Sequence, residues 1–222
     1  MIINVLFFIA SYVIEDVFQY NLVSNLGMKY VGSVLFNPIQ IFTHMFLHAG
    51  FAHILFNMFG LLMFGSMIER YIGTPKFLAL YLLSGLGAAF LEQAYWGYHI
   101  YQYFSSLFPS EALQNNLFAQ GNALRGVELA TARRLITPMV GASGAVYGLL
   151  AAYALFFPNA KLMLLFFPYP IKAKFFVPGI MVLDLYMGIS NHSWDNIAHF
   201  AHLGGGLTGL LLILYWKNNR LW

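Results

Sequence analysis

The sequence contains no cysteine. This absence excludes disulfide bonds, metal sites built from thiolates and a cysteine nucleophile. Charged residues are scarce as well: they make up 9% of the 222 residues, against about 25% in soluble domains. The net charge of +3 is small and spread along the chain, so no nucleic-acid partner is expected.

Hydrophobic residues, in contrast, make up 60% of the chain. We therefore expect one integral membrane domain over residues 1–222, with the lipid bilayer around it. The predicted fold class is all-α, a six-helix bundle with a long, partly helical outer loop at 99–138. The apolar runs place the spans at about 1–20, 41–67, 77–98, 139–157, 175–190 and 197–216.

The distribution of lysine and arginine predicts the orientation. The loops after the second and fourth predicted spans, with the C-terminal tail, carry seven such residues, and the other loops carry four. The seven are Arg70, Lys76, Lys161, Lys172, Lys174, Lys217 and Arg220; the four are Lys29, Arg125, Arg133 and Arg134. Both termini are therefore expected in the cytoplasm. Because no transit peptide is visible, we expect a bacterial plasma membrane.

With this topology, the second, fourth and sixth predicted spans all run inward, and their polar residues gather near their outer ends. Polar groups are expensive in hydrocarbon, so their presence at one depth indicates a functional site. These residues are His48, His53, Asn57, Ser143, His199 and His202.

Ser143 stands among small residues, in Gly141-Ala142-Ser143-Gly144. Small neighbours let a base and a substrate carbonyl approach a serine hydroxyl together, as a nucleophile requires. Tyr147 follows at i+4 and shares its helix face. The alternative interpretation is simple helix packing, because Gly144-x-x-x-Gly148 is also a small-xxx-small pattern.

The histidines follow helical spacing. Gly205 and Gly209 follow His202 at i+3 and i+7, so that a histidine stands above a bare glycine strip. Such strips let helices approach closely, which is one way to reach the roughly 2.6–3.2 Å of a Ser–His hydrogen bond. His53 and Asn57 are separated by one helical turn and could donate hydrogen bonds to an oxyanion, together with backbone N–H groups near the start of the fourth span.

Three motifs give the chain a resemblance to the rhomboid intramembrane serine proteases of the six-helix bacterial type, over essentially its whole length. His48-Ala49-Gly50-Phe51-Ala52-His53-Ile54-Leu55-Phe56-Asn57 resembles the H-x-x-x-x-H-x-x-x-N of the family. Gly141-Ala142-Ser143-Gly144 resembles its G-x-S-G, and Ala201-His202-Leu203-Gly204-Gly205 with Gly209 resembles its A-H-x-x-G-x-x-x-G.

The resemblance implies a role for each matching residue. Ser143 is the nucleophile and His202 the base, in a dyad that lacks an aspartate. Tyr147 orients His202, and Gly141 shapes the approach to the oxyanion site, which His53 and Asn57 line. His48 is structural. The implied activity is the cleavage of transmembrane or juxtamembrane segments of other membrane proteins through an acyl-enzyme, with no cofactor and no metal.

One position departs from the family pattern. Many members carry Trp-Arg shortly before the second helix, and this chain has Ile39-Gln40 there. The departure puts the anchoring of the first loop in doubt, but not the chemistry.

Two alternatives to the protease remain open. A catalytically inactive rhomboid-like protein that binds membrane proteins would lack the serine or the histidine, and this chain has both. A histidine-rich metalloprotease could use His48, His53, His199 and His202, but the sequence has no H-E-x-x-H.

Two acids and two histidines in or near the predicted spans have no catalytic role in this interpretation. We interpret Glu92 as wetted or capping, and Asp184 as paired with a polar group in the bundle. His199 is assigned to a helix end or to substrate access, and His44 to the membrane interface.

Overall fold

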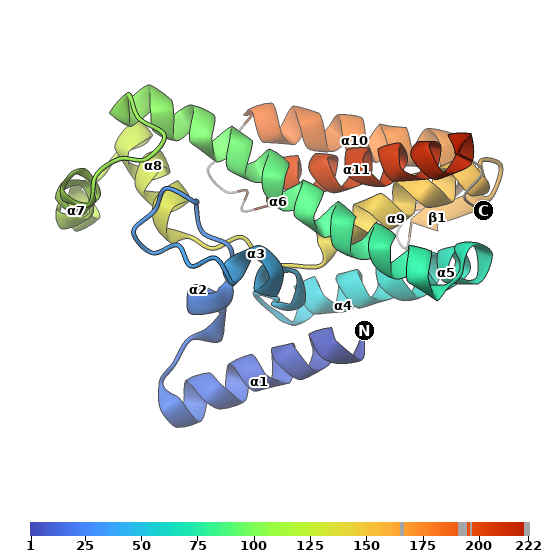
Figure 1. Ribbon diagram of the computed structural model, residues 1–222, viewed down its shortest axis with the longest axis horizontal. Coiled ribbons are helices and arrows are strands. Elements are labelled where there is room, and N and C mark those ends of the chain that lie inside the picture. The colour runs from blue at the N-terminus through green and yellow to red at the C-terminus, as the bar shows by residue number, and fades with distance from the viewer. Residues whose placement is uncertain (165–166, 191–194, 196, 220–222) are drawn as a thin grey trace. The chain divides into compact units, whose positions relative to one another are not determined.

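A computed structural model describes residues 1–164, 167–190, 195 and 197–219 (Figure 1). The chain forms two compact units. Unit 1 comprises Met1, Leu55–Leu91 and Ala142–Trp222, and unit 2 comprises Ile2–Ile54 and Glu92–Gly141. The helices α4 and α6 each contribute residues to both. Most of the predicted loop 191–196, and Arg220, lie outside the described residues.

Unit 1 consists almost entirely of helix. Its elements are the end of α4 (Phe51–Gly60), a π-helical turn (Leu61–Gly65), α5 (Ser66–Ile72), the first part of α6 (Thr74–Phe104), α9 (Ser143–Phe156), α10 (Ala173–Ser190) and α11 (His199–Asn218). Between α9 and α10 lies a short antiparallel hairpin, β1 (Lys161–Leu164) and β2 (Phe167–Lys172), which the prediction of an all-α fold had not included.

Unit 2 contains shorter helices and more loop. Its elements are α1 (Ile2–Phe18), α2 (Leu22–Leu26), α3 (Gln40–Thr43), a 3₁₀ turn (His44–Phe46), α7 (Glu111–Ala119), a second 3₁₀ turn (Gly121–Ala123) and α8 (Gly126–Ile136), with the remainder of α4 and α6. The predicted partly helical character of 99–138 is confirmed by α7 and α8.

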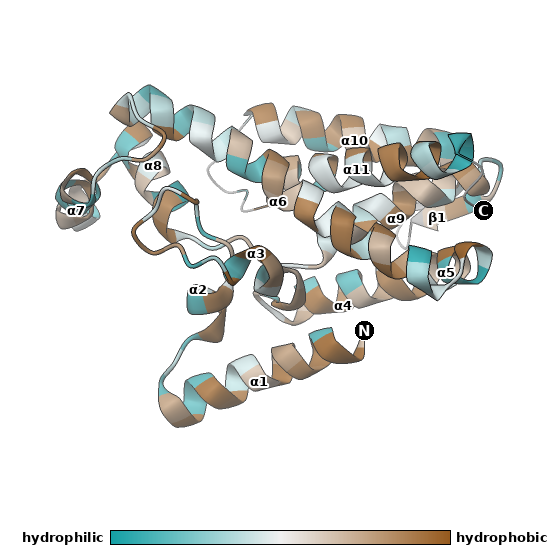
Figure 2. Cartoon of the chain, viewed as in Figure 1, coloured by the Kyte–Doolittle hydropathy of each residue, from teal (hydrophilic) through white to brown (hydrophobic). Residues whose placement is uncertain are grey.

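Among the described residues, three helices are long and apolar enough to cross a bilayer: Phe51–Ile72, Thr74–Phe104 and Ala173–Ser190. Figure 2 shows hydrophobic residues along most of α1 as well. The side chains of Val182, Tyr186 and Ile189 on α10 are mostly exposed, as expected for a helix that faces lipid. The count of six spans stays a prediction.

Two predicted helix starts are wrong. The second span was expected from Ile41, but Leu47 has an extended backbone and the long helix begins only at Phe51. The fourth was expected from Met139, but α9 begins at Ser143. Met139 instead exchanges two backbone hydrogen bonds with Met28, of 2.8 and 2.9 Å, and a residue held in such a bridge is not free to begin a helix.

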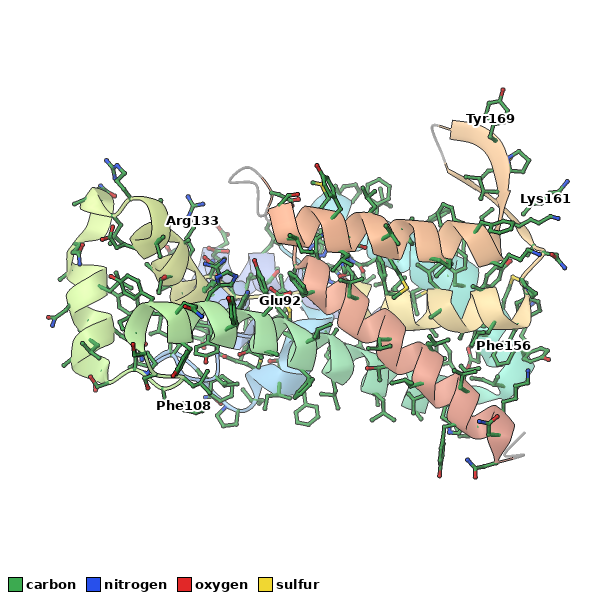
Figure 3. The ribbon with its side chains drawn as sticks, turned by 90° about the horizontal axis from the view of Figure 1, so that it is seen from above. Glu92, Phe108, Arg133, Phe156, Lys161 and Tyr169 are labelled. Atoms are coloured by element: carbon green, nitrogen blue, oxygen red, sulfur yellow. The ribbon has the colours of Figure 1, made fainter. Side chains whose placement is uncertain are left out.

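Glycine determines how closely α9 and α11 approach each other in unit 1, where they run side by side (Figures 1 and 3). A Cβ atom on Gly205 would collide with the backbone of Gly144, and a Cβ atom on Gly209 would lie 2.5 Å from the carbonyl oxygen of Gly148. The two backbones therefore touch, as the spacing of these glycines predicted.

Glutamine side chains hold the first loop of unit 2. The Gln40 side chain accepts from the N–H of Lys29 at 3.2 Å and donates to the carbonyl oxygen of Asn25 at 2.9 Å. The Gln93 side chain accepts from the N–H of Val31 and donates to the carbonyl oxygen of Lys29. The Gln114 side chain likewise accepts from the N–H of Val34 and donates to the carbonyl oxygen of Gly32. Gln40, the residue at the departure from the family pattern, is therefore itself an anchor of this loop.

Candidate active site

The centre of the candidate site is a stacked pair of rings where α9 and α11 cross. The rings of Tyr147 and His202 lie 4.3 Å apart between centroids and only 12° from parallel. Ser143, the first residue of α9, lies one turn before Tyr147 on the same helix. This stacking limits the tilting of the imidazole; the orienting role of Tyr147 stays a prediction.

Close helix packing brings Ser143 near the level of His202. A Cβ atom on Gly144 would lie 3.4 Å from the carbonyl oxygen of Ala201, the neighbour of His202. In the described part of the chain, Ser143 makes no hydrogen bond to His202. Catalytic hydrogen bonds are often long in the absence of substrate and tighten only when it binds, so this pairing stays a prediction.

The start of α9 offers hydrogen-bond donors beside the serine. The first intrahelical bond of α9 runs from the N–H of Val146 to the carbonyl oxygen of Ala142. The N–H groups of Ser143, Gly144 and Ala145 precede it and have no intrahelical acceptor. Donors at a helix N-terminus suit an anion, so this turn can stabilise an oxyanion formed at Ser143.

Behind His202 lies a chain of alternating aspartate and histidine residues. Nδ1 of His202 is 3.2 Å from Oδ1 of Asp184, on α10. The same oxygen is 2.6 Å from Nδ1 of His199, and Nε2 of His199 is 2.8 Å from Oδ2 of Asp195. The pairing predicted for Asp184 is therefore confirmed. The expectation that no aspartate contacts His202 is wrong, because α10 turns the Asp184 carboxyl toward α11.

The structure places the other motif residues as follows. His53 and Asn57 lie one turn apart on α4, and Asn57 is buried. Nδ1 of His53 accepts a long bond, 3.4 Å, from the N–H of Ala49. His48 is buried and packs edge-to-face against His53, with ring centroids 5.0 Å apart. Because α4 begins only at Phe51, His48 lies before the helix and not inside it as predicted.

Gly141, two residues before Ser143, has a backbone conformation that favours glycine. Its φ is +125°, a region that residues with a Cβ atom rarely adopt. Its N–H donates to the carbonyl oxygen of His44 at 2.9 Å. A glycine is thus needed here for the chain to enter α9, whatever its part in an oxyanion site.

A family model for the Rhomboid domain matches residues 36–218. The chain belongs to the rhomboid family. This family consists in general of serine intramembrane proteases, so membrane proteolysis is supported for the family as a whole.

Curated relatives of this rhomboid protein come from bacteria and from mitochondria. Rhomboid protease AarA of Providencia stuartii is 28% identical over 178 residues, 76% of this chain and 52% of that protein. Rhomboid protein 1, mitochondrial, of Saccharomyces cerevisiae is 28% identical over 180 residues, 79% of this chain and 41% of that protein. The human presenilin-associated rhomboid-like protein, mitochondrial, is 29% identical over 193 residues, which are 84% of this chain and 41% of that protein. The chain thus spans about half or less of the length of these relatives.

One position of this rhomboid protein was misjudged from sequence. Glu92 is buried, and it stands in the middle of α6, which continues to Phe104 (Figure 3). His44 is buried too, and its Nδ1 lies 3.0 Å from the carbonyl oxygen of Gln40. The expectation of a wetted Glu92 is therefore wrong, and the placement of His44 at the membrane interface stays a prediction.

Sequence reasoning missed that His199 contacts both Asp184 and Asp195. One signal was available: Asp195 and His199 are four residues apart, a spacing typical of paired side chains. The contact of His199 with the Asp184 carboxyl on α10 depends on how α10 and α11 pack, and no local pattern reports that.

Asp184, His199 and His202 could together hold a metal ion, because their ligand atoms lie within 4.8 Å of one another. Two imidazoles and a carboxylate suit Zn²⁺. These same atoms, however, already bind one another, and a metal on Nδ1 of His202 would leave the ring proton on Nε2. His202 could then not accept a proton from a serine.

Proposed function

We propose that this rhomboid protein is a serine endopeptidase that cleaves transmembrane or juxtamembrane segments of other membrane proteins. The observation that carries the proposal is the stacking of Tyr147 on His202 at the crossing of α9 and α11, where α9 begins with Ser143. A restrained imidazole near a serine among small residues matches the needs of an activated nucleophile.

In the proposed reaction, the Ser143 oxygen attacks the peptide carbonyl carbon while its proton passes to Nε2 of His202. The carbonyl oxygen becomes an oxyanion, which the free N–H groups of the first turn of α9 stabilise. The C–N bond then breaks, and His202 returns the proton to the leaving amine. Water, deprotonated by His202, hydrolyses the resulting acyl-enzyme.

His53, Asn57 and Gly141 keep the oxyanion role that their motif implies. The tautomer of His53 supports this: if Nδ1 accepts from the N–H of Ala49, a neutral ring carries its proton on Nε2 and can donate there. His53 would thus act as a donor, whereas His202 acts as a base.

The substrates follow from the environment of the site. The site lies in a membrane domain, so membrane-spanning protein segments are the substrates that can reach it from the bilayer. Such segments must unwind locally, because helical hydrogen bonds shield the peptide bond. The cytoplasmic termini and the outward-facing site remain part of the proposal and rest on the charges of the loops. The bacterial plasma membrane remains part of it as well, and the relatives include both bacterial and mitochondrial proteins.

Covalent labelling by a fluorophosphonate probe tests the proposal, with the protein reconstituted in lipid. We expect wild type and the control variant Ser66→Ala, on α5, to be labelled, and Ser143→Ala and His202→Ala not to be. A panel of transmembrane substrates then tests for cleavage. If folded wild-type protein takes no label and cleaves nothing, the protein is a non-catalytic binder; if label survives in Ser143→Ala, another residue is the nucleophile.

A further inference from the structure

We propose that Asp184 is a positioning residue for His202, so that this rhomboid protein carries a Ser–His–Asp arrangement in place of a bare dyad. The inference rests on the proposed function. Its starting point is the 3.2 Å distance between Oδ1 of Asp184 and Nδ1 of His202. Asp184 is 6% exposed, and a carboxyl buried in a membrane helix normally has a functional or pairing role.

The contact selects one tautomer of His202. An ionised carboxylate can only accept hydrogen bonds, so Nδ1 of His202 must carry the proton. In the neutral ring, Nε2 is then the acceptor, as a base for Ser143 requires. Without Asp184 both tautomers would be accessible, and only one of them can accept the serine proton.

The contact also orients the ring together with Tyr147. Tyr147 covers one face of the imidazole, which limits tilting but permits rotation within the plane of the ring. A hydrogen bond at Nδ1 acts in that plane and opposes this rotation. Face and edge of the ring are therefore restrained by different residues on different helices, α9 and α10.

His199 holds the Asp184 carboxyl in place, and Asp195 contacts the other ring nitrogen of His199. With both aspartates ionised, His199 can donate to both only as the doubly protonated imidazolium, through Nδ1 and Nε2. Charge then alternates along the chain Asp195, His199, Asp184, His202. When His202 takes the proton of Ser143, the imidazolium forms beside the carboxylate of Asp184, which remains ionised throughout.

A purely structural role is the competing explanation, because Asp184 lies closer to His199 than to His202. Asp184 could simply join α10 to α11 through His199. The two explanations differ at His202: a joint between helices leaves its tautomer unchanged, whereas a positioning residue determines it.

Asp184→Asn is the test variant, since it keeps the size of the side chain and removes the charge. Asp184→Glu is the conservative variant for rescue, and Asp16→Asn, at an exposed aspartate of α1, is the matched control for the change of charge. Each variant is prepared in lipid, its thermal unfolding is compared with wild type, and its reaction with a fluorophosphonate and its kcat and KM on a cleaved transmembrane substrate are measured. Nitrogen-15 NMR of the histidine rings reports the His202 tautomer, assigned with His202→Gln.

We expect Asp184→Asn to lower kcat and the labelling rate by about a hundredfold or more with KM nearly unchanged. The protonated-Nδ1 signal of His202 should give way to a mixture of tautomers. Asp184→Glu should restore part of the rate, and Asp16→Asn should leave it within about twofold of wild type. If Asp184→Asn labels within about twofold of wild type and keeps the tautomer, the inference is overturned and the proposed protease stands.

If wild type shows no serine-dependent labelling, the proposed function fails, and the NMR measurement alone decides the role of Asp184. Loss of the protonated-Nδ1 tautomer in Asp184→Asn supports its contact with His202. An unchanged tautomer overturns that contact.

Discussion

The two units of this rhomboid protein meet the same requirement, that buried backbone be packed or hydrogen-bonded, in different ways. In unit 1, helices already bond their own backbone, and Gly144, Gly148, Gly205 and Gly209 bring two of them into direct contact. In unit 2, several backbone groups of the first loop have no such helical partner, and the side chains of three glutamines bond them instead. Where helices suffice, small residues determine the geometry; where they do not, specific polar side chains must.

The comparison predicts that unit 1 is most sensitive to added volume. Gly205→Ala should destabilise the protein by about 3 kcal/mol or more, because the added methyl group collides with the backbone of Gly144 and helix backbones cannot yield as side chains do. Thermal unfolding in lipid measures the effect. Gly179→Ala on α10 is the matched control, because a Cβ atom there meets nothing within 4 Å; equal melting temperatures for the two variants would contradict the role of the crossing.

Unit 2 should be the more sensitive to acid. Burial lowers the pKa of His44 and of His48 to about 4 in each case, and both precede Phe51, where the membrane helix begins. In the unfolded chain each histidine has a pKa near 6.5, so it binds a proton there before it does in the folded protein. The stability of the fold is therefore fully present above about pH 6.5 and decreases as the pH falls toward 4. Each histidine contributes about 3 kcal/mol across that window.

Hydrogen exchange at pH 7.5 and pH 5, corrected for intrinsic exchange rates, measures the protection of backbone amides in each unit separately. We expect peptides around residues 40–50 to lose protection at pH 5, and less so in His44→Gln. Equal protection at both pH values would show that these histidines do not titrate on unfolding.

Removal of a glutamine should act on unit 2 alone. Gln40→Leu leaves the N–H of Lys29 and the carbonyl oxygen of Asn25 without their partner, and we expect a loss of about 2 kcal/mol. Exchange should rise over residues 25–35 and stay unchanged on α9 and α11. The control is Gln102→Leu, at an exposed position of α6; a loss of the same size there would mean that the bonds of Gln40 are not the cause.

The smallest expected effect is that of metal removal. Since Asp184, His199 and His202 bind one another directly, a chelator should leave the labelling of Ser143 within about twofold of its untreated rate. Inhibition by chelator, with Ser143→Ala still cleaving substrate, would support the metalloprotease alternative in place of the serine enzyme.

Much of the site could be predicted because its signals are local. The i, i+4 relation of Ser143 and Tyr147 and the glycines after His202 are properties of a single helix, and helical periodicity is enough to read them. Predicted helix starts failed where backbone groups had distant partners: Met139 bonds Met28, and Gly141 bonds His44. Hydropathy does not register such bonds, so the apolar residues 139–142 were assigned to a helix that begins only at Ser143.

The sequence by itself determined the membrane class, the family and the residues that could carry the chemistry, because composition and helical spacing are encoded along the chain. The tertiary structure decided which of those residues touch. Asp184 is 18 residues from His202, and only the packing of α10 beside α11 places its carboxyl at the imidazole. Contacts between helices depend on their relative rotation and depth, and these are set by the sum of many small packing energies rather than by any local pattern.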